Sequence, residues 1–194
     1  MANFKTRAMT DEEFKLIVTT IRDGFTTADG VHVRPAPVVS AAILTQGNTG
    51  LRCGDVLRLK ISDFVYERGK YRFNNFVEQK TGKVRNLPIA TEFFTYLQSY
   101  AIENGIGKDE RLFPISVRTV QHHLKQVSDY LGLTGISSHS ARKYMATKIY
   151  QSSKDPEVVR SVLLHSSITV SQNYISLAPE AVDRALQNHC SIPT

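Results

Sequence analysis

The stretch FVYERGKYRFNNFVEQKTGKVRNLPI, residues 64–89, contains two β-hairpin patterns in succession. In the first, the aromatic-rich segments Phe64–Tyr66 and Tyr71–Phe73 flank a turn that includes Gly69. The second is centred on Lys80–Lys83 and has apolar residues on both sides. Two such runs around a short glycine-containing turn are typical of antiparallel strands. We therefore expect a small antiparallel sheet of about three strands in the middle of the chain.

Helical patterns lie on both sides of this stretch. Thr10–Glu13 has the spelling of a capping box, and the apolar residues that follow recur at helical spacing up to Phe25. Residues 26–37 have the composition of a loop. Further helical patterns fall at about 38–46, 51–60, 91–101, 117–131, 140–150, 158–164, 170–175 and 179–187. The predicted fold class is α+β, mainly α, with the small sheet inserted between helices.

Composition narrows the kinds of partner that the protein can bind. The chain has 194 residues with 41% hydrophobic and 22% charged residues, which fits one globular domain. Its formal net charge of +6 favours a polyanion, with nucleic acid ahead of an anionic membrane. No apolar stretch approaches the ~20 residues that span a bilayer. The two cysteines lack the spacing of metal ligands, so we expect no metal or other cofactor. So few cysteines also suit a reducing compartment, and we expect a cytoplasmic protein.

Two cationic segments are candidates for binding a phosphate. Arg52 begins a helical pattern, and its guanidinium offers a two-pronged donor to phosphate oxygens. Asp55 lies one helical turn further and could hold that guanidinium, although a surface ion pair explains the same spacing. Lys80 lies in the second hairpin turn, where it could reach a leaving oxygen or simply be solvated. The residues alone do not separate Lys80 from Lys83.

Two further segments carry groups suited to phosphoryl transfer. His139 and Arg142 are one helical turn apart, so both can face one phosphate, but an H-x-x-R match occurs readily by chance. His165 follows a short helical pattern and could donate a hydrogen bond to a phosphate oxygen. Tyr174 is a candidate nucleophile among eight tyrosines that the residues alone do not separate, and its phenol needs surrounding positive charge to react.

Four segments together resemble the tyrosine recombinase family, also called the phage integrase family. They are TGLRCGDVLRLKISDF at 49–64, VEQKTGKVRNLPI at 77–89, ISSHSARKYMAT at 136–147 and VVRSVLLHSSITVSQNYI at 158–175. The resemblance implies the catalytic-domain fold of that family. It places the catalytic residues at Arg52, Lys80, His139, Arg142, His165 and Tyr174, with Asp55 in support. One departure is Leu164, because the family usually has glycine before the last histidine.

The resemblance also implies an activity and partners. Tyr174 would attack a phosphodiester of double-stranded DNA, and the 3′-phosphotyrosyl link would then be transferred to another strand without a cofactor. A homo-tetramer would hold two duplexes, while the free protein would be a monomer or a weak oligomer. We expect residues 1–194 to form one catalytic domain without a separate N-terminal core-binding domain, and with a C-terminal helix and tail at 177–194. This resembles short single-domain members encoded by bacteria, phages or mobile elements; the alternative is a fragment of a longer integrase.

Two other activities remain open at this point. A type IB topoisomerase shares the tyrosine chemistry but rejoins the same strand. A regulator that binds DNA without cutting it could also use this fold.

Overall fold

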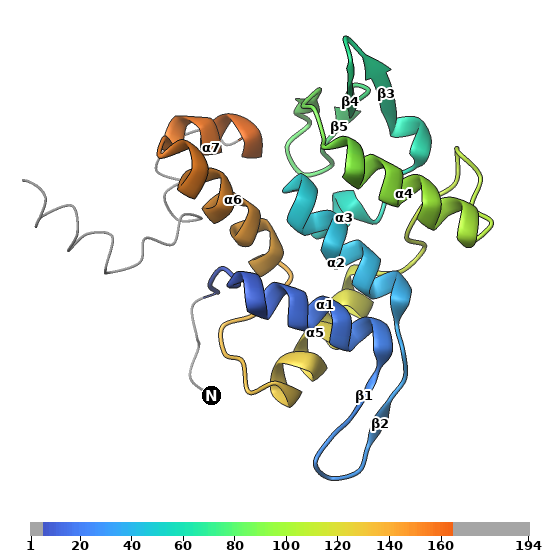
Figure 1. The fold of residues 1–194 in the computed structure, drawn as a ribbon, viewed down its shortest axis with the longest axis vertical. Helices are drawn as coiled ribbons and strands as arrows, with labels where there is room; N and C mark the ends of the chain where they lie inside the picture. The colour runs from blue at the N-terminus through green and yellow to red at the C-terminus, as the bar shows by residue number, and fades with distance from the viewer. Residues whose placement is uncertain (1–5, 165–194) are drawn as a thin grey trace, which may run out of the picture.

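The computed structural model describes residues 6–164 of the chain, which are mostly helical, with short strands at the edges of the helical body (Figure 1). The helices are α1 Asp11–Asp23, α2 Pro37–Thr49, α3 Cys53–Val56, α4 Thr91–Glu103, α5 Val117–Tyr130, α6 Ser140–Ser153, α7 Pro156–Leu163 and the 3-10 turn η1 Ile61–Asp63. The strands are β1 Phe25–Thr26, β2 His32–Val33, β3 Phe64–Glu67, β4 Lys70–Phe73, β5 Phe76–Val77 and β6 Val84–Arg85. The predicted α+β class is confirmed. The helices predicted at 170–175 and 179–187 lie outside the described residues.

Helix α1 begins at the predicted capping box. The Glu13 N–H donates to the Thr10 hydroxyl at 3.2 Å, and the Thr10 N–H donates to the Glu13 carboxylate at 2.9 Å. The buried face of α1 packs on α2. A Cβ at Gly47 of α2 would lie 2.4 Å from the Phe14 ring, so this close approach of the two helices requires glycine.

Helix α2 is the centre of the core and contacts α1, α5 and α6. It continues through the predicted break at 47–50 and ends at Gly50, whose φ of 64° is left-handed. The helix predicted over 51–60 is only the single turn α3. The chain leaves the helical path there because the Leu59 carbonyl accepts a hydrogen bond from the distant Leu112 N–H at 2.8 Å. This turn places the Arg52 backbone at the edge of the core.

The first predicted hairpin is formed by β3 and β4. The two strands pair antiparallel along their whole length, with Glu67 opposite Lys70 at the turn. Arg68 and Gly69 occupy the turn with φ of 52° and 78°. Two successive positive φ values are the geometry of a type I′ turn, which matches the right-handed twist of the strands.

The second predicted hairpin is formed by β5 and β6. Phe76 pairs with Arg85 and Val77 pairs with Val84. Successive side chains of a strand point to opposite faces of the sheet. Phe76 and Arg85 therefore face inward together, and the two valines face solvent.

A third extended segment joins the first hairpin. The Phe73 N–H donates to the Leu87 carbonyl at 3.1 Å, and the Ile89 N–H donates to the Tyr71 carbonyl at 2.9 Å. Pro88 has no N–H, so this segment pairs through one bridge rather than a full ladder. The predicted sheet of about three strands is confirmed in outline.

The region predicted as a loop at 26–37 contains part of a small hairpin. β1 and β2 pair antiparallel, and the Thr27 N–H donates to the Val31 carbonyl at 2.9 Å. Gly30, with φ of 83°, allows the reversal. The base of this hairpin is held to the core because Phe25 stacks on Tyr130 of α5 at 4.4 Å.

The C-terminal helices complete the described part. α6 packs on α2, and α7 packs on α6. The loop before α6 is tied to the start of the described chain, because the Arg7 N–H donates to the Gly135 carbonyl at 2.9 Å and the Lys143 ammonium donates to the Thr6 carbonyl at 2.7 Å. No helix within residues 6–164 has the length and apolar character needed to cross a membrane.

Candidate active site

Four predicted catalytic residues converge from three distant segments of the chain. Arg52 precedes α3, Lys80 lies in the β5–β6 turn, and His139 and Arg142 lie at the start of α6. Partial burial lowers the pKa of His139, and the positive charges of Arg142, Lys80 and Arg52 lower it further. Charges in water act over about 10 Å, so these groups share one site.

Arg52 is held by a residue that the sequence did not single out. Its Nη1 donates to the Glu78 carboxylate at 2.6 Å. The predicted Arg52–Asp55 pair is wrong. Asp55 instead accepts from the Gln79 N–H at 2.8 Å and pairs with Arg58 at 3.2 Å. Asp55 therefore fixes the second hairpin to α3, because its carboxylate binds the Gln79 N–H and Arg58 instead of the Arg52 guanidinium.

Arg142 is a buried link between three elements. Its side chain is 0% exposed, and it donates to the Gly50 carbonyl through Nη1 and to the Leu163 carbonyl through Nη2 at 2.9 Å. We expected His139 and Arg142 to face one phosphate together, but here His139 is only partly exposed to solvent and Arg142 is fully buried. A phosphate can contact the Arg142 guanidinium only if some surrounding groups move.

The two lysines of the second hairpin have different surroundings. Lys80 is exposed, and within the described part of the chain it makes no hydrogen bond or ion pair. Lys83 donates to the Leu164 carbonyl at 2.6 Å, at the C-terminal end of α7. Lys80 is therefore the lysine that remains available to a substrate, in agreement with the family pattern.

The surroundings of His139 favour the neutral form of its imidazole. A pKa lowered from the ordinary value of 6.5 leaves the ring neutral at pH 7. The cause is partial burial together with neighbouring cations, among them Lys143 on the same helix. Its backbone N–H donates to the Ser137 hydroxyl at 3.2 Å, which holds the residue at the N-cap of α6.

Sequence reasoning missed Glu78 and Arg85. Both side chains are almost fully buried, and they form an ion pair of 2.7 Å. Burial raises the pKa of Glu78, but the hydrogen bond and charge of Arg85 and the charges of Arg142 and Arg52 outweigh it and hold the pKa below its usual range. Strand alternation could have found both residues, because each shares a face with the buried Phe76 or is paired with it.

His165 and Tyr174 lie outside the described residues. The residue before His165, Leu164, has a φ of 53° at the C-cap of α7. Glycine adopts this left-handed conformation without strain, which explains why glycine suits the position and why leucine there is a departure.

Comparison with known proteins agrees with this geometry. The model of the phage integrase family matches residues 7–181. The tyrosine recombinase XerA of Pyrococcus furiosus is 26% identical over 194 residues, which cover 92% of this chain and 62% of XerA.

Two solved structures share the fold. The XerH site-specific recombinase, in a post-cleavage complex with a palindromic difH substrate, has a TM-score of 0.75 at 21% identity, over 97% of this chain and 54% of that chain. The catalytic domain of bacteriophage HP1 integrase has a TM-score of 0.62 at 19% identity, over 95% of each chain.

The chain spans about half to three-fifths of the length of its curated relatives, namely 62% of XerA and 50% of XerD from Yersinia pestis. The family match covers 175 of its 194 residues, counted from 7 through 181. The chain belongs to the phage integrase family.

Proposed function

We propose that this chain catalyses site-specific DNA recombination, in which strands are cut and rejoined through a 3′-phosphotyrosyl intermediate. The observation that carries the proposal is the convergence of Arg52, Lys80 and Arg142 on the imidazole of His139. Three cations near a neutral base suit a phosphodiester that gains negative charge during reaction. The family membership of the chain supports the same activity.

In the first step the phenol oxygen of Tyr174 attacks the phosphorus of a DNA phosphodiester. A bond forms between phosphorus and the tyrosine oxygen, and the bond to the 5′-oxygen breaks. His139 accepts the phenol proton, and Lys80 gives a proton to the leaving 5′-oxygen. Arg52 and Arg142 neutralise the charge on the pentacoordinate phosphate. His165 donates a hydrogen bond to a phosphate oxygen.

In the second step a 5′-hydroxyl from a partner duplex attacks the phosphotyrosyl phosphorus. Lys80 accepts the proton of the attacking hydroxyl, the tyrosine oxygen leaves and takes back its proton from His139, and a new phosphodiester forms. One phosphoester bond replaces another in each step, so the reaction needs no nucleotide cofactor.

DNA binding rests on positive charge outside the reaction centre as well. Arg118, His122 and Lys125 are exposed and recur at helical spacing on α5, so they form one basic stripe. We include in the proposal that four copies act on two duplexes, while free protein is monomeric or weakly associated. Affinity for DNA should fall steeply with salt, because phosphate contacts release counterions.

Covalent capture tests the proposal. Protein is incubated with fragmented DNA from its source genome, denatured, and the protein-linked ends are sequenced, with Tyr174→Phe in parallel. We expect adducts at one or a few sites that are absent in Tyr174→Phe. Dispersed adducts would indicate topoisomerase-like relaxation. DNA binding without adducts from either protein would indicate a regulator and contradict the proposal.

A further inference from the structure

We propose that Glu78 is a positioning residue that directs the Arg52 guanidinium toward the phosphate and couples it to the end of α7. This inference rests on the proposed recombinase function. It assigns a role to a buried carboxylate that makes no contact with the reacting atoms.

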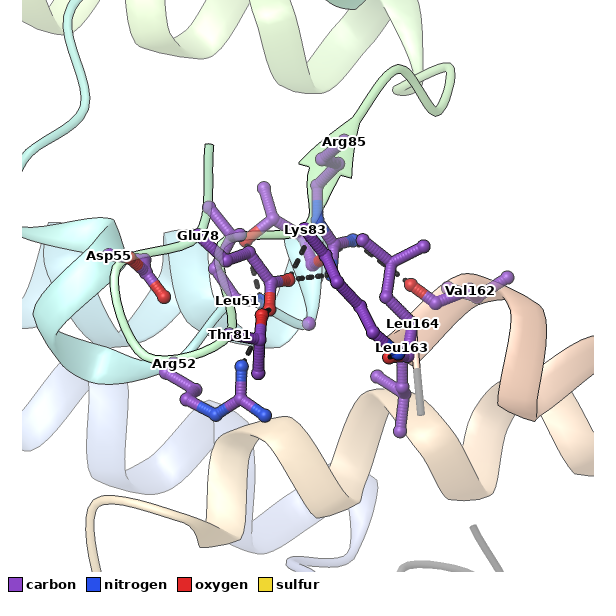
Figure 2. A network of polar contacts seen from close by, with 12 residues as sticks. Leu51, Arg52, Asp55, Glu78, Thr81, Lys83, Arg85, Val162, Leu163 and Leu164 are labelled. Carbon is purple, nitrogen blue, oxygen red and sulfur yellow. Dashed lines mark hydrogen bonds and ion pairs between the residues drawn. The ribbon is translucent and has the colours of Figure 1, made fainter. Parts of the chain in front are cut away.

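The Glu78 carboxylate lies between two guanidinium groups (Figure 2). One oxygen accepts from Arg52 Nη1 at 2.6 Å and from the Thr81 hydroxyl at 3.2 Å. The other accepts from Arg85 Nη2 at 2.7 Å and Nε at 3.3 Å. Glu78 is 0% exposed, so its carboxylate is shielded from water and attracts both guanidinium groups more strongly than a surface carboxylate would.

The ion pair with Glu78 leaves two N–H groups of the Arg52 guanidinium available to a ligand. Within the described residues, Arg52 uses only Nη1 for hydrogen bonding, so Nε and Nη2 remain as donors. These two N–H groups form the parallel pair that binds a phosphate bidentately. The Arg52 side chain is 21% exposed, which is enough for a ligand to reach it. Glu78 therefore occupies one side of the guanidinium and turns the other side toward the site.

The backbone of Glu78 stabilises the β5–β6 turn that carries Lys80. Its N–H donates to the Lys83 carbonyl at 2.9 Å, and its carbonyl accepts from the Gly82 N–H at 2.8 Å. These bonds close the turn that carries Lys80. One residue thus fixes Arg52 through its side chain and the Lys80 turn through its backbone.

Arg85 extends the network to α7. It donates to the Thr49 carbonyl at 3.2 Å and to the Val162 carbonyl at 3.0 Å. The next two carbonyls, of Leu163 and Leu164, accept from Arg142 at 2.9 Å and from Lys83 at 2.6 Å. Three successive carbonyls at a helix C-terminus are each bound by a cation, which the helix dipole favours. His165 is the next residue in the sequence, so this anchor ends one residue before a predicted catalytic residue.

The negative charge of Glu78 is what the network requires. In Glu78→Gln a single amide oxygen remains, and Arg85, which is buried and makes two contacts with the carboxylate, is expected to retain it. The amide NH₂ would then face the Arg52 guanidinium, a donor against a donor. Arg52 would lose its fixed orientation, while its charge would remain and keep attracting DNA.

The test compares Glu78→Gln with Glu67→Gln, which removes an equal charge from an exposed pair of the neighbouring hairpin. Arginine ¹⁵N NMR of the free protein reports rotation of the Arg52 guanidinium, with Arg52→Lys used for assignment. We expect separate Nη signals in wild type and Glu67→Gln, and averaged signals in Glu78→Gln. If Glu78→Gln does not fold, Glu78→Asp keeps the charge beside Arg85 but is too short to reach both arginines, and the same averaging is expected.

The second readout is adduct formation on an oligonucleotide duplex containing a site recovered by covalent capture. We expect Glu78→Gln to lower the single-turnover rate on the order of 10-fold or more at saturating protein, with unchanged or tighter DNA affinity. Added to Arg52→Lys, the change should slow the reaction little further, because both act on one group. A purely structural role would lower affinity and stability together and would remain additive with Arg52→Lys.

The outcomes separate the two proposals. Absence of adducts from wild-type protein would remove the recombinase function, whatever the NMR shows. Adducts from wild type at a rate equal to that of Glu78→Gln, or an Arg52 guanidinium equally restrained in both, would overturn the role of Glu78 alone.

Discussion

Each of the two hairpins β3–β4 and β5–β6 contains a Glu–Arg ion pair, but the two pairs have different roles. In β3–β4, Glu67 pairs with Arg72 at 3.0 Å, with side chains 49% and 30% exposed. In β5–β6, Glu78 pairs with Arg85 at 2.7 Å, with side chains 0% and 1% exposed. The first pair is solvated, whereas the second links Arg52 to the core. Burial, and not residue type, decides which pair organises the site.

The neighbours of each hairpin explain the difference. β3–β4 packs on α4 through its aromatic base, while its tip extends away from the helices (Figure 1). The inward face of β5–β6 meets the ends of α2 and α7, where the free carbonyls of Thr49 and Val162 need donors. A buried arginine satisfies both carbonyls, and a buried carboxylate is then required to balance its charge.

The largest expected effect distinguishes the lysines of the two hairpins. Lys80→Ala should lower the rate of adduct formation by about 10²- to 10⁴-fold, the range for loss of a general acid. Lys70→Ala, also exposed and adjacent to a hairpin turn, should leave the rate unchanged. Gel quantification of the covalent adduct in single-turnover reactions measures both.

A substrate with sulfur in place of the 5′-bridging oxygen sharpens this comparison. A thiolate leaves without being protonated, so Lys80→Ala should react with it nearly as fast as wild type. Failure of the sulfur substrate to restore the rate would assign Lys80 to binding the phosphate instead.

The next largest expected effect is on the stability of the fold, and it compares the arginines of the two Glu–Arg pairs. Arg85→Met leaves Glu78 partly uncompensated and two carbonyls without their donor, so we expect a loss of about 3–5 kcal/mol. Arg72→Met should leave the urea midpoint almost unchanged, because its pair is solvent-exposed. Equal midpoints for the two variants would show that the buried pair contributes no more than the surface pair.

Acid titration compares the two glutamates. The hydrogen bond from Arg72 lowers the pKa of Glu67, and Arg85 lowers that of Glu78 against the opposing effect of burial. A folded-state pKa below 4.5 gives stability that is present above about pH 4.5 and is lost as pH falls through the folded value.

Salt should separate these two contributions. At 1 M NaCl, where the screening length is about 3 Å, the contribution of Glu67 should vanish and that of Glu78 should persist. Urea unfolding between about pH 3 and 6, with Glu67→Gln and Glu78→Gln as references, measures both. Equal loss at high salt would mean that water reaches Glu78.

The smallest expected effect is strain relief at two left-handed residues. Leu164 after α7 has a φ of 53°, and Arg68 in the first hairpin turn has a φ of 52°. Glycine at either position removes a strain of about 1–2 kcal/mol, partly offset by a more flexible unfolded chain. We expect Leu164→Gly and Arg68→Gly each to raise unfolding free energy by under about 1 kcal/mol. A decrease for Leu164→Gly alone would show that its side-chain packing outweighs the strain.

Much of the fold was predictable because its signals are local. The capping box at Thr10, the two hairpin turns and the spacing on α5 each depend on neighbouring residues, and all appear in the structure. The helix predicted over 51–60 failed because a bond from Leu112, far along the chain, holds Leu59 outside a helix. The small β1–β2 pair was missed because two-residue strands leave almost no alternation to detect.

For the site, residue types and motif order in the sequence lead to the prediction of Arg52, Lys80, His139 and Arg142, since phosphoryl transfer demands cations and a base. The partner of Arg52 was not predictable from spacing. Asp55 is three residues away and Glu78 is twenty-six residues away, yet the structure pairs Arg52 with Glu78. The sequence specifies which charges exist, but the pairing of a charge depends on burial and distance in three dimensions, and both arise only when α2, α7 and the second hairpin meet.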